Sequence, residues 1–109
     1  MLRLPQLDGH FVQAVSEVAT VNMMYGCGGA GLRAMTFTSS PGFSLMLEGI
    51  SYMIGAEVPG VIVNVMRGGP STGLPTMPAQ ADVMQARWGT HGDHPAVALV
   101  PASVREVYD

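Results

Sequence analysis

Two charged side chains stand beside apolar segments at positions suited to binding a ligand. Glu17 begins a segment without further charge as far as Gly31, and Arg67 follows the β-branched run Val61–Val65. A carboxylate can hold or transfer a proton, and a guanidinium is shaped to bind a carboxylate through two parallel hydrogen bonds. Other roles remain open, because an acid at Glu17 also complements a helix macrodipole and Arg67 also suits a surface ion pair.

Alternating strand and helix signals indicate which elements position these side chains. We predict strands at Phe11–Ala14, Arg33–Thr38, Val61–Val65 and Ala96–Val100. We predict helices from Glu17 to about Tyr25, from Phe43 to about Gly55, over Ala79–Arg87, and from Ser103 onward. Ser16 is a suitable N-cap for the first helix, and Gly26–Gly29 would close it. The turn signal Ser39-Ser40-Pro41-Gly42 precedes the second helix.

This alternation predicts an α/β fold, with a parallel sheet, flanking helices and right-handed crossovers. The strand Val61–Val65 has the β-branched density of a strand buried on both faces. The loop from Met66 to Pro78 that follows it is longer than the usual four to six residues of such connections. Open α/β sheets bind ligands beyond the carboxyl ends of their strands, so we expect a functional loop carrying Arg67.

Composition excludes several classes of function. The net charge of −3 and the absence of a Lys/Arg cluster disfavour binding to nucleic acid. No apolar run approaches the length of a membrane span, and no leader signal precedes His10, so the default location is cytoplasmic. Charged residues make up only 12% of the 109 residues while hydrophobic ones make up 48%, so we expect much apolar surface, including that of the two long helices, to meet another chain.

The order of several motifs resembles the α subunit of 2-oxoacid:ferredoxin oxidoreductases, and most closely the 2-oxoglutarate type. The central motif runs from Asn64 to Thr76, NVMRGGPSTGLPT, and continues in Gln80-Ala81-Asp82 and in Gln85-Ala86-Arg87-Trp88-Gly89-Thr90-His91-Gly92-Asp93. The likeness extends to Phe11-Val12-Gln13 with Glu17, to Ala34-Met35-Thr36, to Ser39–Met46, and to Val104–Val107. It covers nearly the whole chain.

The resemblance implies a role for each candidate site residue. The glutamate that matches Glu17 bonds the N1′ nitrogen of the thiamine aminopyrimidine ring in this family, so Glu17 is expected to be catalytic and cofactor-binding. The arginine that matches Arg67 faces the substrate carboxylate, so Arg67 is expected to bind the 2-oxoacid. The turn with Thr38, Ser39 and Ser40 faces the thiamine pocket in related enzymes, although its hydroxyls would equally cap the following helix.

The resemblance also implies partners and an overall reaction. The reaction is oxidative decarboxylation of a 2-oxoacid to an acyl-CoA and CO2, with coenzyme A as co-substrate and ferredoxin as electron acceptor. Thiamine diphosphate would bind between this chain and a β subunit that carries the diphosphate-binding domain, Mg²⁺ and an iron–sulfur cluster, within a larger hetero-oligomer. The single cysteine, Cys27, agrees with a cluster held elsewhere. Residues 1–109 are expected to form a partial pyrimidine-binding domain that lacks its first strand–helix unit and is truncated at its C-terminus, inactive alone.

Two other functions stay open on the residues alone. The chain could be a non-catalytic interaction or dimerisation module whose apolar helices only dock. His91, Asp93 and His94 lie close together in sequence and could indicate a metal site, but Gly92 and Pro95 oppose the helix that would bring both histidines to one face. Gln80 and Asp82 are expected to cap or orient the Arg67 loop.

Overall fold

Two parallel strands and the helices connected to them form the centre of the molecule. The structure is a computed structural model, and it describes residues 3–109. Its elements are, in order, η1 (a 3-10 helix, Leu4–Leu7), α1 (Glu17–Gly29), β1 (Met35–Ser39), α2 (Ser40–Gly55), β2 (Val61–Val65), α3 (Asp82–Trp88) and α4 (Val104–Tyr108). Strand β1 pairs with β2 in parallel, with Met35 opposite Val61 and Ser39 opposite Val65. The predicted α/β fold with a parallel sheet and flanking helices is confirmed.

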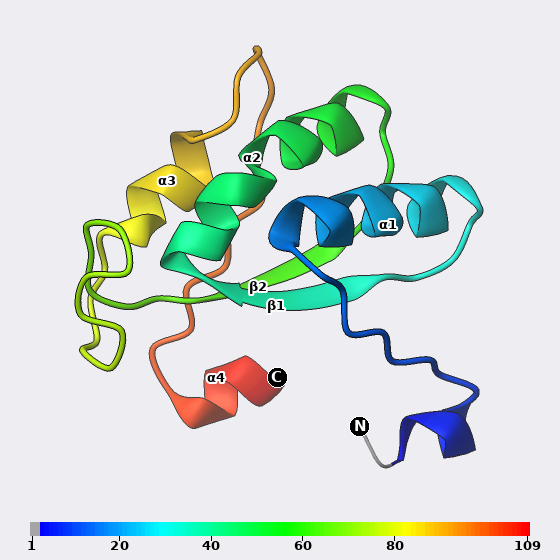
Figure 1. Cartoon of the computed structure of the whole chain (residues 1–109), viewed down its shortest axis with the longest axis horizontal. Coiled ribbons are helices and arrows are strands. Elements are labelled where there is room, and N and C mark those ends of the chain that lie inside the picture. The colour runs from blue at the N-terminus through cyan, green and yellow to red at the C-terminus, as the bar shows by residue number, and fades with distance from the viewer. Residues whose placement is uncertain (1–2) are drawn as a thin grey trace.

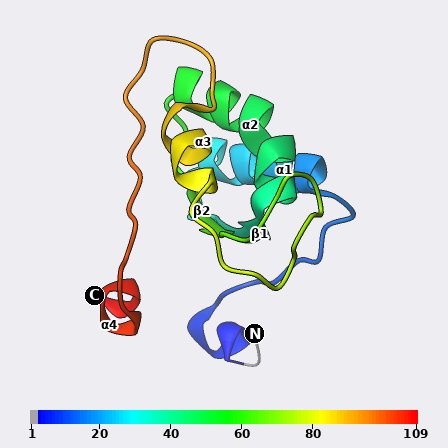
Figure 2. The same ribbon diagram turned by 90° about the vertical axis from the view of Figure 1, so that its left-hand side faces the viewer.

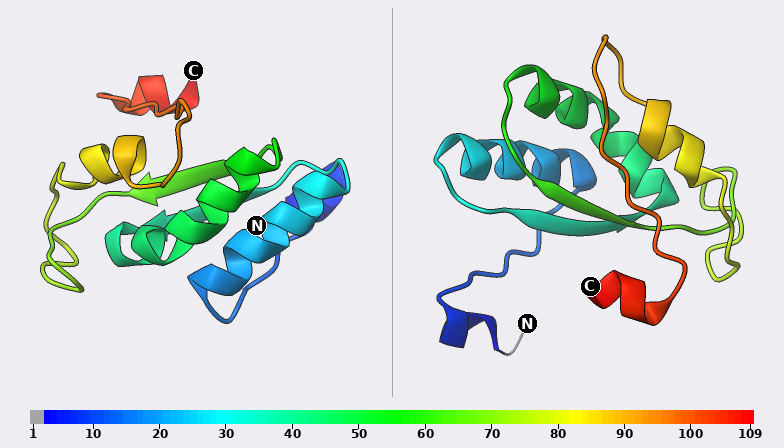
Figure 3. Two further views of the ribbon diagram at one scale, coloured as in Figure 1. Left: turned by 90° about the horizontal axis from the view of Figure 1, so that it is seen from above. Right: turned by 180° about the vertical axis from the view of Figure 1, so that it is seen from behind.

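Helices α1 and α2 lie side by side on one face of the sheet, while η1 and α4 lie on the other side (Figures 1 and 2). The view from above shows α1 and α2 running in the same direction beside each other (Figure 3). Both helices therefore begin at the same end of the molecule. Among the described residues, no helix is long and apolar enough to cross a membrane.

The core lies between these two helices and the sheet. It is formed by Val21 and Met24 of α1 with Met46 and Met53 of α2. Methionine side chains are flexible enough to fill an irregular space between helices. The opposite face of the sheet is open, because the large apolar side chains of Met35, Phe37, Val61 and Val65 are exposed. The prediction that Val61–Val65 is buried on both faces is therefore wrong for this chain by itself.

The glycines predicted to close α1 instead belong to it. Ser16 caps the helix as expected, since its Oγ accepts a hydrogen bond from the Ala19 amide at 3.2 Å. The helix then continues through Gly26 and ends at Gly29. A Cβ at Gly28 would overlap Val58, so close packing against the segment before β2 explains this glycine and offsets its low helix propensity. The second helix begins earlier than predicted, at Ser40 instead of Phe43.

Two predicted strands are absent from the sheet. Phe11–Ala14 is irregular, with Phe11 and Val12 exposed, and Ala96–Val100 has no backbone ladder with β2 or any other described strand. A strand needs a partner for its backbone groups, and apolar content alone does not supply one. Helix α3 begins at Asp82, later than the predicted Ala79. The start of α4 is as predicted, with Ser103 Oγ accepting from the Glu106 amide.

Candidate active site

The candidate residues gather at the edge of the sheet where both strands end. The register places Ser39, the last residue of β1, opposite Val65, the last residue of β2. Helix α2 starts directly after β1, and the Arg67 loop starts directly after β2. Glu17 joins them because α1 begins beside the start of α2 (Figure 1). The edge therefore combines groups from three separate parts of the chain.

Glu17 is half-buried at the first turn of α1. The ion pairs between described residues join His91 to Glu48 and Arg105 to Asp109, so neither neutralises Glu17. Of the valines near it in sequence, Val21 is buried, whereas Val12 and Val18 are exposed. The carboxylate thus lies at a partly open position where a ligand can reach it.

Gly42 brings Glu17 close to Thr38. A Cβ added at Gly42 would overlap Thr38 Oγ1, and it would lie 2.9 Å from Glu17 Cγ and 3.0 Å from Glu17 Oε1. Gly42 is buried in the first turn of α2. Only glycine fits here without displacing one of these two side chains. The sequence signalled this residue only as part of a turn, and its contact with Glu17 depends on how α1 packs against α2.

Arg67 is held through both its main chain and its side chain. The Arg67 amide donates to Ser40 Oγ at 3.3 Å, and the Ser40 hydroxyl donates to the Arg67 carbonyl at 3.2 Å. The Nε atom of Arg67 donates to Ser39 Oγ at 3.0 Å, and its Nη1 donates to the Thr72 carbonyl at 2.8 Å. Ser40 is buried, and Ser39 and Arg67 are half-buried. These bonds fix the guanidinium at the strand ends.

The loop after Arg67 is closed on itself and then anchored by α3. Within it, the Gly68 amide donates to the Met77 carbonyl at 2.8 Å, and the Leu74 amide donates back to the Gly68 carbonyl at 3.2 Å. At its far end, buried Asp82 accepts a hydrogen bond from Asn64 Nδ2 at 3.0 Å. The contact ties the start of α3 to β2, in line with the expected orienting role of Asp82.

An open hollow of about 390 Å³ lies beside Arg67. Its lining consists of Ser39, Val65, Met66, Arg67, Pro75, Thr76, Met77 and Pro78. This volume lies within the range of about 300 to 1,000 Å³ that is usual for small-molecule pockets. Another hollow, of about 350 Å³, lies along Leu4–Phe11 and includes none of the candidate residues. The hollow beside Arg67 is therefore the one that contains candidate site residues.

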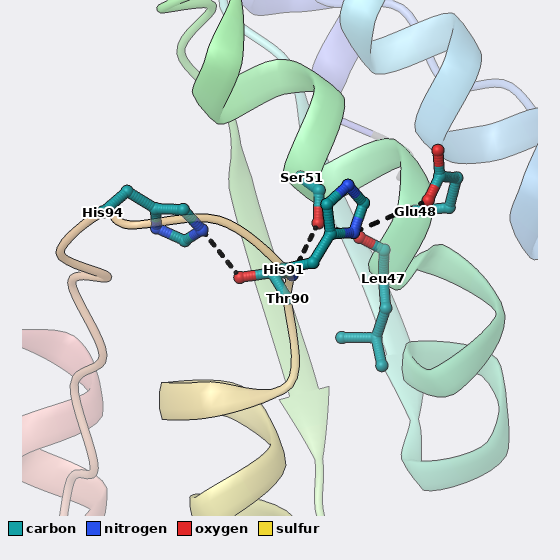
Figure 4. Close-up of polar contacts among 6 residues, drawn as sticks. All are labelled: Leu47, Glu48, Ser51, Thr90, His91 and His94. Atoms are coloured by element: carbon teal, nitrogen blue, oxygen red, sulfur yellow. Dashed lines mark hydrogen bonds and ion pairs between the residues drawn. The ribbon is translucent and has the colours of Figure 1, made fainter.

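His91 and His94 lie in the segment after α3, and His91 contacts α2 (Figure 4). His91 Nδ1 is 3.8 Å from Glu48 Oε2, and the His91 amide donates to Ser51 Oγ. His94 Nε2 instead lies 3.0 Å from Thr90 Oγ1. Since α2 rises about 1.5 Å per residue, Ser51 is roughly 16 Å along the helix from Ser40. Among residues 3–109, no group of three His, Cys, Asp or Glu side chains is placed to hold a metal ion.

The structure thus brings Glu17, Thr38, Ser39, Ser40 and Arg67 to one edge. It shows Ser39 and Ser40 bonded to Arg67, while their expected contact with a cofactor stays a prediction. Sequence reasoning did not identify Gly42 as a site residue. It also did not identify Thr72 as a hydrogen-bond partner of Arg67, because the Thr72 carbonyl is a main-chain group that any residue type could supply.

The fold and this site define an α/β ligand-binding domain, in which parallel strands carry polar groups to the edge at their carboxyl ends. Residues 2–109 match the model of the family described as "Pyruvate flavodoxin/ferredoxin oxidoreductase, thiamine diP-bdg". The chain belongs to this family of thiamine diphosphate-binding domains. The resemblance noted in the sequence is thereby confirmed.

Several curated proteins are similar to this chain. The 2-oxoglutarate synthase subunit KorA of Archaeoglobus fulgidus is 55% identical over 105 residues, which are 96% of this chain and 30% of that protein. The ketoisovalerate oxidoreductase subunit VorB of Methanothermobacter marburgensis is 50% identical over 106 residues, which are 96% of this chain and 30% of that protein. The chain thus spans less than a third of the length of these relatives.

A solved structure has the same fold. It is a 2-oxoglutarate:ferredoxin oxidoreductase from Magnetococcus marinus with 2-oxoglutarate, coenzyme A and succinyl-CoA bound. The TM-score is 0.82 at 45% sequence identity, covering 86% of this chain and 16% of that one.

Proposed function

We propose that this chain supplies the cofactor-facing acid and the substrate-binding arginine of a thiamine diphosphate-dependent 2-oxoacid:ferredoxin oxidoreductase. The observation that carries the proposal is the convergence of Glu17, the Thr38–Ser40 turn and Arg67 at one edge of the sheet. Family membership gives the class of cofactor. The relatives' names give the class of substrate, a 2-oxoacid.

The residues at this edge fit the pyrimidine end of thiamine diphosphate. Glu17 offers a partly open carboxylate that can share a hydrogen bond with a ring nitrogen, and Thr38 offers a hydroxyl beside it. A Cβ at Gly42 would fill the space between these two groups. When bound, the cofactor supplies the electron sink that decarboxylation of a 2-oxoacid requires. Glu17 then holds the proton that the ring nitrogen shares, at its carboxylate oxygen.

Arg67 performs a different task, because every 2-oxoacid carries a negatively charged carboxylate next to its keto group, and this carboxylate is lost as CO2. A guanidinium beside an open hollow can bind that carboxylate until it leaves. The full reaction converts the 2-oxoacid and coenzyme A to an acyl-CoA and CO2, and the electrons released pass to ferredoxin. We propose 2-oxoglutarate as the substrate, since KorA proteins and a 2-oxoglutarate-bound structure are among the similar proteins.

The remaining cofactors need a partner subunit. Cys27 is the chain's one cysteine, whereas an iron–sulfur cluster is usually held by four thiolates. We therefore propose that a β subunit carries the cluster, the diphosphate-binding domain and Mg²⁺, within a larger hetero-oligomer. The apolar side chains exposed on the helices, such as Val18, Leu45 and Tyr52, support contact with such a chain. They equally suit the alternative, an interaction module without catalysis.

The test is turnover by the complete enzyme that contains this chain, measured as ferredoxin reduction dependent on thiamine diphosphate, 2-oxoglutarate and coenzyme A. We expect Glu17→Ala to abolish turnover. We expect Arg67→Ala to weaken 2-oxoacid binding by about 2 to 4 kcal/mol, which is roughly 30- to 700-fold. Glu48→Ala and Arg105→Ala, at exposed positions, are the matched controls. Full turnover by Glu17→Ala, or no cofactor-dependent turnover in the unmodified enzyme, would contradict the proposal and favour the interaction module.

A further inference from the structure

Two N–H groups of the Arg67 guanidinium already donate hydrogen bonds within the chain. It carries five N–H groups in one rigid plane. The Nε–H group donates to Ser39 Oγ at 3.0 Å, and one Nη1–H group donates to the Thr72 carbonyl at 2.8 Å. No described residue accepts a hydrogen bond from Nη2. The N–H groups without a described partner are therefore the two on Nη2 and one of the two on Nη1.

This occupancy decides between two ways of binding a carboxylate. A carboxylate can bind side-on, to Nε and Nη2, or end-on, to Nη1 and Nη2. The Ser39 hydroxyl takes the single Nε–H group that side-on binding requires, whereas Nη1 keeps a second N–H group beside its bond to Thr72. We propose that Ser39 is a positioning residue that selects end-on binding of the 2-oxoacid carboxylate by Arg67. This inference rests on the proposed function, since it specifies how the substrate of the same site is held.

The local structure of Ser39 supports the role. Ser39 is the N-cap residue of α2, yet its side chain makes no capping hydrogen bond. Serine is among the preferred N-cap residues because its hydroxyl accepts from a first-turn amide. The N-cap serines of α1 and α4, Ser16 and Ser103, both do so. Ser39 alone among these three directs its hydroxyl to an arginine instead, which leaves the helix start without a side-chain cap.

A second contact makes the arrangement specific. The Ser40 hydroxyl makes hydrogen bonds to both the amide and the carbonyl of Arg67. The register of the sheet places Ser39 opposite Val65, two residues before Arg67. With its main chain fixed by Ser40 and its Nε fixed by Ser39, the guanidinium has little freedom to rotate and expose its other edge. The end carrying Nη2 is the part left for a ligand.

The experiment compares Ser39→Ala, Ser39→Thr and Ser103→Ala in the complete enzyme that contains this chain. Ser39→Ala should raise the KM for 2-oxoglutarate roughly tenfold, with kcat within about twofold, as expected for loss of uniform binding. Ser39→Thr keeps the hydroxyl and should restore KM, while Ser103→Ala should leave KM unchanged because it removes only a distant cap. The activation constant for thiamine diphosphate should stay unchanged in all three.

A crystal structure with 2-oxoglutarate bound is the second readout. We expect the carboxylate next to the keto group on Nη1 and Nη2 in the unmodified enzyme, and on Nε and Nη2 in Ser39→Ala. A side-on carboxylate in the unmodified enzyme would overturn the inference, as would a Ser39→Ala variant with unchanged KM. A changed activation constant for thiamine diphosphate with unchanged KM would assign Ser39 to the cofactor instead. If Arg67→Ala also leaves KM unchanged, the proposed function itself fails, which separates the two failures.

Discussion

The contact between Gly49 and Val21 sets how closely α1 approaches α2. A Cβ at Gly49 would overlap Val21 Cγ1 and lie 2.6 Å from Val21 Cγ2. Val21 is 1% exposed, and a β-branched side chain in a helix has one strongly preferred rotamer. Rotation of Val21 away from a new methyl group would therefore need an unfavourable rotamer. We predict that Gly49→Ala forces the two helices apart and destabilises the protein.

The magnitude follows from two opposing terms. Replacing a helical glycine by alanine contributes about 0.8 to 1.0 kcal/mol of helix propensity, while overpacking a filled core costs about 1 to 3 kcal/mol. The net effect of Gly49→Ala is then a loss of up to about 2 kcal/mol. Gly26→Ala is the matched control, since a Cβ at Gly26 in α1 meets nothing within 4 Å. It should stabilise the protein by up to about 1 kcal/mol.

The assay is thermal unfolding of the two variants beside the unmodified protein. One kcal/mol corresponds to about 4 to 8 °C in Tm for a domain of this size that unfolds as one unit. We expect Gly26→Ala to raise Tm and Gly49→Ala to lie below it by roughly 1 to 3 kcal/mol. Equal Tm values for the two variants would show that Gly49 has free space, and the close approach of α1 to α2 would then be refuted.

Three further substitutions test other contacts of the site. In Gly42→Ala the new methyl would overlap Thr38 Oγ1 and displace Glu17, so turnover should fall by about 100-fold; unchanged turnover would show that Glu17 needs no such placement. Asp82→Ala leaves the Asn64 amide without its partner and should cost about 1 to 3 kcal/mol in thermal unfolding, with Asp82→Asn costing less. His91→Ala removes an exposed ion pair with Glu48. It should change the free energy of unfolding by less than about 1 kcal/mol and leave the KM for 2-oxoglutarate unaltered. A large loss of activity would instead give His91 a catalytic role.

Local signals predicted the parts of this fold that depend on short segments. Ser16 and Ser103 cap helices where the sequence indicated, because an N-cap needs only a hydroxyl and the next few amides. The element predictions that were wrong depend on contacts between residues far apart in the sequence. Gly26–Gly29 continues α1 because Gly28 packs against Val58, a residue thirty positions away in the chain. Ala96–Val100 has strand composition but pairs with no described strand.

In the candidate site, too, local signals predicted some features and distant contacts determine the others. Glu17 and Arg67 were predicted from residue type, strand position and family resemblance. The bond between Arg67 Nε and Ser39 Oγ joins residues 28 positions apart, and it depends on the β1–β2 register. A one-residue shift of that register would move Ser39 to the other face of the sheet. No local pattern encodes this pairing, so the sequence indicated Glu17 and Arg67 but not the bonds that hold Arg67 in place.

Each contribution to the edge depends on a different contact. Glu17 is placed by α1–α2 packing at Val21 and Gly49, and Arg67 by the strand register and the two serines. The loop beyond Arg67 is placed by Asp82 on Asn64. These contacts share no residue, so each can be tested by its own substitution. Substitutions along the α1–α2 contact should therefore lower turnover through Glu17, while substitutions at Ser39 should act on 2-oxoacid binding alone.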